Sequence, residues 1–133
     1  MTFTNYSVFF SVVMQDHKHD YFIDEIINEI ERKHGKVFCG LRLWSDENQY
    51  PPYDEAFQIV LESLQKSSLY VLYYPERVVS GALVELGMAV AMKKPVLIYT
   101  KSVENMTYFM RGYQDLITDH NLIMPWIDEY MTL

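Results

Sequence analysis

The chain has 133 residues, half of them hydrophobic, and a formal net charge of −7. This length and apolar content predict a single globular domain over residues 1–133, large enough to bury a core without disulfides. The acidic charge argues against nucleic-acid or anionic-membrane partners, because both bind clustered Lys and Arg. With one cysteine, no cationic and apolar leader and no apolar run near the ~20 residues that span a bilayer, we expect a soluble, cytoplasmic protein.

The first third of the chain predicts a strand, a helix and a second strand. Residues 6–14 are rich in β-branched and aromatic side chains and lack strict alternation, which is typical of a strand covered on both faces. Asp20 is the expected cap of a helix that ends at Gly35, with one apolar face made of Ile23, Ile26, Ile27 and Ile30. Residues 36–44 predict the second strand.

The middle of the chain repeats this alternation. Residues 45–53 are acidic, aromatic and broken by two prolines, which predicts a loop. Asp54 is the expected cap of a helix that ends near Ser67, with one face made of Phe57, Val60, Leu61 and Leu64. The third strand is predicted at residues 68–74.

The remaining elements are a helix at residues 80–92, a strand at 95–100 and a helix at 102–118. A short fifth strand is expected at 121–125. Strands that alternate with helices predict an α/β fold, with a central parallel sheet of about five strands and helices on both faces. We expect a flavodoxin-like three-layer domain with strand order 2-1-3-4-5, whose ligands bind beyond the carboxyl ends of the strands.

Glu85 is the candidate catalytic residue. It is the only charge between residues 80 and 92, a stretch made otherwise of apolar and small side chains. A helix that is apolar all round is expected to be buried, and a buried carboxylate needs a partner or a chemical role. The alternative is that Glu85 faces solvent or bonds a loop amide.

Aromatic side chains near the predicted crevice are candidate stacking surfaces for a nicotinamide or adenine ring, because flat rings bury area at little entropic cost. These residues are Trp44, Tyr50, Tyr53 and Tyr74. The alternative for each is a place in the core.

Other candidate substrate-binding residues flank the same crevice. Ser11 lies in the second half of the first predicted strand, where it borders the crevice. Ser80 is expected to cap the Glu85 helix, where it would also reach a ribose or phosphate. Gly81, like the other small residues of that helix, would permit close approach to a ligand or to the sheet. Arg77 and Arg111 are candidates to pair with a pyrophosphate, with surface solvation as the alternative.

No metal or cofactor is expected. Residues 16–20 read Asp-His-Lys-His-Asp, but Lys18 would repel a cation, so a solvated turn is the better interpretation. Cys39 has no acid or base beside it in sequence, which favours a buried, inert thiol. The chain also lacks a Gly-rich phosphate loop, which weighs against dehydrogenases and NTPases.

Two families resemble these residues. Residues 6–11 with the following Asp16 look like the opening strand of TIR domains, and Ser80 with Glu85 matches the serine and glutamate of their catalytic helix. Residues 81–95 also resemble the motif of nucleoside 2-deoxyribosyltransferases, in which the glutamate attacks the sugar C1′. Val79 and Ala82 replace the Asp and Thr of that motif, and the Trp-Cys pair of many TIR helices is missing.

The TIR resemblance implies NAD or NADP as substrate rather than cofactor, and a glycohydrolase reaction that needs Glu85. It also implies a homo-oligomer or assembly with other domains, and a role in antiviral defence or signalling. The transferase resemblance implies base exchange or hydrolysis of nucleosides. A third hypothesis is a non-catalytic module that binds a nucleotide or assembles with similar domains.

Overall fold

The computed structural model describes residues 5–13, 20–40, 51–78 and 80–132. Its centre is a five-stranded parallel sheet, as the alternation of elements predicts, and its order β2-β1-β3-β4-β5 is the one expected for a flavodoxin-like domain. The strands are β1 (Tyr6–Val12), β2 (Val37–Phe38), β3 (Ser67–Tyr73), β4 (Val96–Tyr99) and β5 (Leu116–Ile117). β1 and β3 are the longest and form the longest register of the sheet, from Tyr6 opposite Ser67 to Val12 opposite Tyr73.

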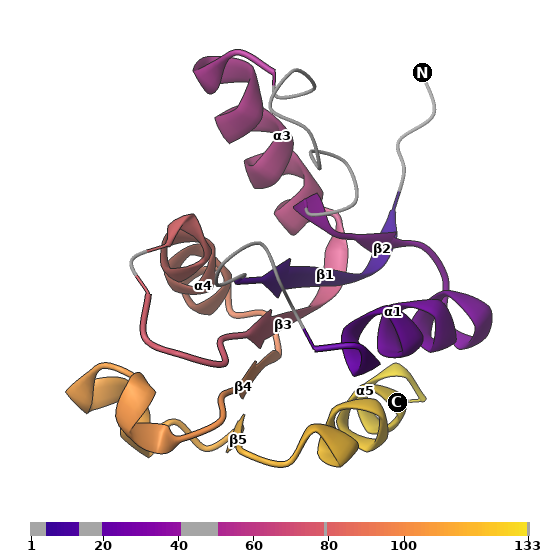
Figure 1. The fold of residues 1–133 in the computed structure, drawn as a ribbon. Coiled ribbons are helices and arrows are strands. Elements are labelled where there is room, and N and C mark those ends of the chain that lie inside the picture. The colour runs from indigo at the N-terminus through magenta and orange to yellow at the C-terminus, as the bar shows by residue number, and fades with distance from the viewer. Residues whose placement is uncertain (1–4, 14–19, 41–50, 79, 133) are drawn as a thin grey trace.

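Helices cover both faces of this sheet, which confirms the three-layer prediction (Figure 1). On one face lie α1 (Phe22–Lys33) and α5 (Ile123–Met131), and on the other lie α3 (Tyr53–Gln65) and α4 (Gly81–Ala91). Three short 3-10 helices follow β4, namely η2 (Val103–Asn105), η3 (Tyr108–Gly112) and η4 (His120–Leu122).

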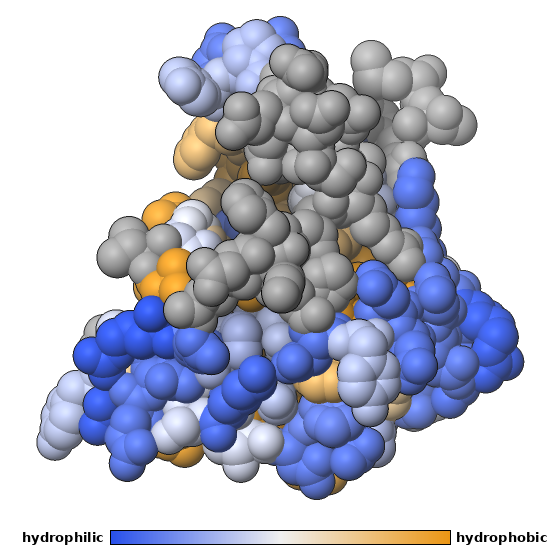
Figure 2. All heavy atoms as spheres, viewed as in Figure 1, coloured by the Kyte–Doolittle hydropathy of each residue, from blue (hydrophilic) through white to orange (hydrophobic). Residues whose placement is uncertain are grey.

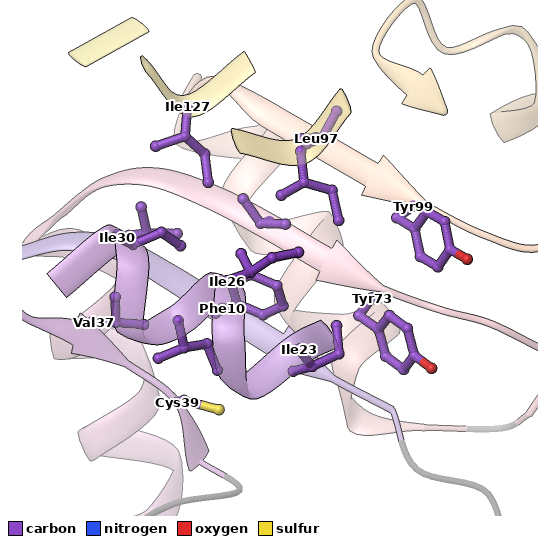
Figure 3. Close-up of a cluster of buried hydrophobic side chains, with 14 of the residues drawn as sticks. Phe10, Ile23, Ile26, Ile30, Val37, Cys39, Tyr73, Leu97, Tyr99 and Ile127 are labelled. Atoms are coloured by element: carbon purple, nitrogen blue, oxygen red, sulfur yellow. The ribbon is translucent and has the colours of Figure 1, made fainter. Parts of the chain in front are cut away.

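Side-chain alternation along β1 divides the core in two. Val8 and Phe10 point into the cluster under α1 and α5, which Figure 3 shows together with the isoleucines of α1. Phe9 belongs to the second cluster, under α3 and α4. Because successive strand residues point to opposite faces of the sheet, Ser11 points to the same face as Phe9 and lies under α4.

α4 packs on the sheet through its small and apolar residues Ala82, Leu86 and Ala89. The expectation that it is buried all round is wrong, because Val84 is 62% exposed and Val90 45% exposed. Figure 2 shows the resulting apolar surface over α4. The helix forms an outer layer, so only one side of it meets the sheet.

The glycines of α4 do not serve close packing either. A Cβ built on Gly81 or on Gly87 would meet no atom within 4 Å. Close approach of helix and sheet therefore depends on Ala82 and Ala89, which are 7% and 0% exposed.

Two predicted helix caps are wrong. α1 has Tyr21 at its N-cap without a side-chain bond, and the Asp20 carboxylate instead accepts a 2.6 Å hydrogen bond from the Tyr73 hydroxyl. α3 begins one residue before Asp54, at Tyr53 after the N-cap Pro52. Of the face predicted for α3, Leu64 is fully buried, whereas Phe57 is 54% exposed.

The second strand is shorter than predicted. β2 ends at Phe38, and Gly40 is already helical, so the predicted strand from 36 to 44 does not continue past Phe38. Residues 41–44 lie outside the described part of the chain.

The last third of the chain departs most from the sequence prediction. Instead of a helix over 102–118 it contains η2, η3 and β5, because residues 116 and 117 pair with Ile98 and Tyr99 of β4. The predicted strand at 121–125 is wrong as well, since these residues belong to η4 and α5. Pro125 fits there because the first turn of a helix needs no backbone donor.

None of the helices in the described ranges combines the length and hydropathy needed to cross a membrane.

Candidate functional site

The candidate site lies where α4 begins, beyond the carboxyl end of β3 (Figure 1). Ser80 is the N-cap of α4, and its hydroxyl accepts a 3.1 Å hydrogen bond from the backbone N–H of Ala82. This confirms the predicted capping role. Glu85 follows in the second turn of the helix, beside the sheet-facing residues Ala82 and Leu86.

The Ser11 hydroxyl donates a 2.9 Å hydrogen bond to Oε1 of Glu85. Ser11 is 5% exposed and lies on β1 opposite Leu72 of the central strand β3. The structure therefore brings together two of the residues predicted for the crevice, one from the sheet and one from the helix. The alternative that Glu85 faces solvent or bonds a loop amide does not fit this contact.

Two opposing effects act on the Glu85 carboxyl. Burial raises its pKa above the ordinary value of 4.5, and the hydrogen bond from Ser11 lowers it, with the effect of burial the larger. Low polarity disfavours the charged form, whereas a donated hydrogen bond favours it. The site therefore holds a carboxylate that is poorly solvated and has a dedicated donor.

Tyr70 is a third member of the site that the sequence analysis missed. Its ring is fully buried in β3, and its hydroxyl donates a 3.1 Å hydrogen bond to the backbone carbonyl of Ala82 in the first turn of α4. Burial raises its pKa well above 10.0, a nearby Ser11 hydroxyl acts in the opposite direction, and the charge of Glu85 adds to the rise. Tyr70 thus stays a neutral donor and ties β3 to the helix that carries Glu85.

A signal for Tyr70 was present in the sequence. A tyrosine in a strand that is buried on both faces must place its hydroxyl against a polar partner. Nothing in the local pattern indicates that this partner is α4.

The candidate aromatic residues do not gather into one surface. Tyr74 is 2% exposed, and its hydroxyl donates to the carbonyl of Val78 at 2.6 Å and accepts from the N–H of Val78 at 2.8 Å. A ring this buried offers no face to a ligand, so the predicted stacking role of Tyr74 does not agree with its position. Tyr53, the first residue of α3, is 97% exposed. Trp44 and Tyr50 lie outside the described residues.

The other predicted binding residues lie near the start of α4. Gly81 is its exposed first residue. Arg77 is exposed in the preceding link and donates a 2.6 Å hydrogen bond to the carbonyl oxygen of Glu104. Both remain predictions as substrate-binding residues.

Within the described ranges, no three His, Cys, Asp or Glu side chains are placed to share a metal ion. Of the motif at residues 16–20, the structure describes Asp20. Its carboxylate accepts the hydrogen bond from Tyr73 and lies 3.6 Å from Nζ of Lys101. Cys39 is buried at 2% exposure.

Solved structures support the fold relationship that the sequence motifs indicated. The chain is similar to a 2-desoxiribosyltransferase from Leishmania mexicana, with a TM-score of 0.66, 10% identity and coverage of 92% of this chain and 97% of that one. It is also similar to a metazoan TIR-STING receptor from C. gigas, with a TM-score of 0.55 and 10% identity, over 92% of this chain and 38% of that one. No protein-family profile and no curated protein sequence matches. These likenesses show a flavodoxin-like fold of the kind shared by TIR domains and deoxyribosyltransferases.

Proposed function

We propose that this protein cleaves the N-glycosidic bond between ribose and nicotinamide in NAD or NADP, with Glu85 as the essential carboxylate. The observation that carries the proposal is the hydrogen bond from Ser11 to a partly buried Glu85 at the carboxyl end of the sheet. Ligands of open α/β sheets bind at this end of the strands.

The chemistry needs a negative charge below the sugar. When the bond from C1′ to the nicotinamide nitrogen breaks, its electron pair stays on the nitrogen, and positive charge develops on C1′ and the ring oxygen of the ribose. An ionised carboxylate can stabilise this charge or attack C1′ to form a glycosyl ester. Water then completes the reaction, giving ADP-ribose, nicotinamide and a proton.

The surroundings of Glu85 suit that role. A carboxylate that burial leaves poorly solvated interacts more strongly with a developing cation than one in water. The Ser11 hydroxyl favours the ionised form and fixes one oxygen, which leaves the second oxygen for the sugar.

The leaving group favours NAD over a nucleoside. Nicotinamide carries a positive ring nitrogen while bound to ribose, so it departs as a neutral molecule and needs no proton. A purine base leaves as an anion unless an acid protonates it. The pair of Ser11 and Glu85 supplies one carboxylate and one hydroxyl. These groups are sufficient for the release of nicotinamide, which needs no proton.

A second candidate function is base exchange on deoxynucleosides. It is favoured by the likeness to the 2-desoxiribosyltransferase, which extends over 97% of that chain. In this reaction a free base, rather than water, attacks the glycosyl ester on Glu85. A free base should then stimulate turnover.

Assembly and biological role belong to the same proposal. The resemblance to TIR domains supports a homo-oligomer, or a complex with other domains, that acts in antiviral defence or signalling. An enzyme of this kind becomes more active per molecule as its concentration rises.

The test measures nicotinamide release from NAD by chromatography at low and high protein concentration, beside a parallel reaction of deoxyadenosine with a free base. Glu85→Gln should lower turnover by about a thousandfold or more, because the amide keeps the shape but cannot carry charge. Its melting temperature should not fall, since burial disfavours the charge that is removed. The control Glu62→Gln, on the exposed side of α3, should behave as the wild type.

Product from deoxyadenosine but not from NAD would favour base exchange. If Glu85→Gln retains wild-type turnover, Glu85 is not the essential carboxylate. No product from either substrate at any concentration would leave the non-catalytic module as the better account.

A further inference from the structure

Two arginines from separate segments meet at one backbone oxygen. Nη2 of Arg77 lies 2.6 Å and Nη2 of Arg111 lies 3.2 Å from the carbonyl oxygen of Glu104. Arg77 belongs to the link between β3 and α4, whereas Arg111 belongs to η3 after β4. Figure 1 shows this link running beside the segment that holds η2 and η3.

The two charges have no acidic partner among the residues that the structure describes. No carboxylate there forms an ion pair with either guanidinium, although the chain carries a net charge of −7. The Glu104 carboxylate accepts a 2.8 Å hydrogen bond from the Ser102 hydroxyl instead. Two like charges held close by one neutral acceptor repel each other, and an anion between them relieves that repulsion.

Both guanidinium groups keep donors for such an anion. Arg77 uses Nη2 for Glu104, and Arg111 uses Nη2 for Glu104 and Nε for the carbonyl of Met106 at 3.2 Å. Nε and Nη1 of Arg77 and Nη1 of Arg111 have no acceptor in the described part of the chain. Both side chains are exposed, so a ligand can reach them.

The segments that carry these arginines are held in place before any ligand binds. Tyr74 fixes Val78 through two hydrogen bonds, as described above. The Asn105 amide donates to the carbonyl of Pro75 at 2.8 Å and to the Thr100 hydroxyl at 3.2 Å, which ties η2 to the link before α4. Preformed sites lose less entropy on binding and therefore bind more tightly.

One arginine of the pair, Arg77, also lies close in sequence to the proposed active site. Arg77 precedes Ser80, the N-cap of the helix that carries Glu85.

We propose that Arg77 and Arg111 form an anion subsite that binds a phosphate group of the substrate, so that the substrate is a phosphorylated nucleotide rather than a nucleoside. The planar guanidinium fork matches phosphate oxygens in a bidentate manner. The assignment to a substrate depends on the proposed function, whereas the anion site itself does not.

The first experiment compares kinetic constants for NAD in Arg77→Gln, Arg111→Gln and the double variant. KM should rise about tenfold in each single variant and further in the double variant, because each loses charge-assisted bonds, whereas kcat should change less than about twofold. The matched control is Arg32→Gln on α1, since Arg32 is exposed and already paired with Glu29 at 2.6 Å. Wild-type KM in the double variant would overturn the proposal.

The second experiment separates nucleotide from nucleoside with nicotinamide mononucleotide and nicotinamide riboside as substrates. The wild type should prefer the mononucleotide in kcat/KM, and the double variant should lose most of that preference. An equal preference in both proteins would show that the arginines support the loops without binding phosphate.

Titration calorimetry with ADP-ribose, pyrophosphate and inorganic phosphate tests the site even if no substrate is turned over. ADP-ribose and pyrophosphate should bind the wild type at least about tenfold more tightly than the double variant. Equal binding to both proteins would overturn the subsite. Inorganic phosphate that binds as tightly as ADP-ribose would overturn its assignment to a nucleotide.

Discussion

The Ser11 hydroxyl and the Glu85 carboxylate form a 2.9 Å hydrogen bond between residues 74 positions apart in the chain. The bond joins β1 to the second turn of α4. It gives a partly buried carboxylate one donor at the end of the sheet where ligands of this fold bind.

The pH dependence of turnover should follow the ionisation of Glu85. The carboxylate is active when charged, and burial raises its pKa above 4.5, so kcat/KM should rise with pH through a midpoint above that value. In Ser11→Ala the donor that favours the charged form is lost, so the pKa rises further and the acidic limb moves to higher pH. Loss of one hydrogen bond should also lower kcat by about two- to tenfold.

The matched control is Ser7→Ala on the same strand. Ser7 is also buried, but its hydroxyl donates to the carbonyl of Gly35 at 2.8 Å, away from Glu85. This variant should lose stability and keep the wild-type pH profile. An acidic limb that is the same in Ser11→Ala and the wild type would contradict a role of Ser11 in tuning Glu85.

Tyr70→Phe tests whether the phenol positions α4. The variant loses the bond to the carbonyl of Ala82, and the free energy of unfolding should fall by about 1 kcal/mol. Turnover should fall several-fold, because the turn that precedes Glu85 loses its tie to β3. Chemical denaturation and steady-state kinetics measure the two effects.

Tyr73→Phe is the comparison for this variant. Tyr73 lies on the same strand but points to the α1 face, where its hydroxyl bonds the Asp20 carboxylate at 2.6 Å. Its removal should reduce stability by a similar amount and leave kcat unchanged. Equal loss of kcat in both variants would mean that activity follows overall stability and not the position of α4.

Asp128 should make a pH-dependent contribution to stability. It accepts a 2.7 Å bond from His34 and lies 3.5 Å from Lys33, and the His34 bond is the main reason that its pKa is lowered below 3.8. A lowered pKa in the folded state stabilises the protein above the ordinary pKa, and this contribution disappears as pH falls through the lowered value. Because the pair is partly exposed, the contribution should be less than about 1 kcal/mol.

Asp128→Asn should therefore lower the melting temperature near neutral pH, and its difference from the wild type should shrink in acid. Glu129→Gln, at the next and exposed position of α5, serves as the control and should change little. A difference that stays constant from neutral to strongly acidic pH would exclude Asp128 ionisation as its cause.

The sequence by itself determined the fold class and the position of the candidate carboxylate. Apolar runs of aliphatic and aromatic residues predict β1, β3 and β4, and a single charge in an otherwise apolar helix identifies Glu85. These signals are local, because strand and helix periodicity can be read from neighbouring residues. The strand order could not be read from the sequence, and the order 2-1-3-4-5 was expected only as the usual one for a flavodoxin-like domain.

Only the tertiary structure decided which distant residues meet. β5 exists because Leu116 and Ile117 pair with β4, although the apolar spacing around them predicts a helix. Ser11 contacts Glu85, and Tyr70 contacts Ala82, because side chains alternate between the two faces of the sheet along β1 and β3, and these two point to the face under α4. Such contacts depend on register and packing between segments far apart in the chain, and no local pattern carries that information.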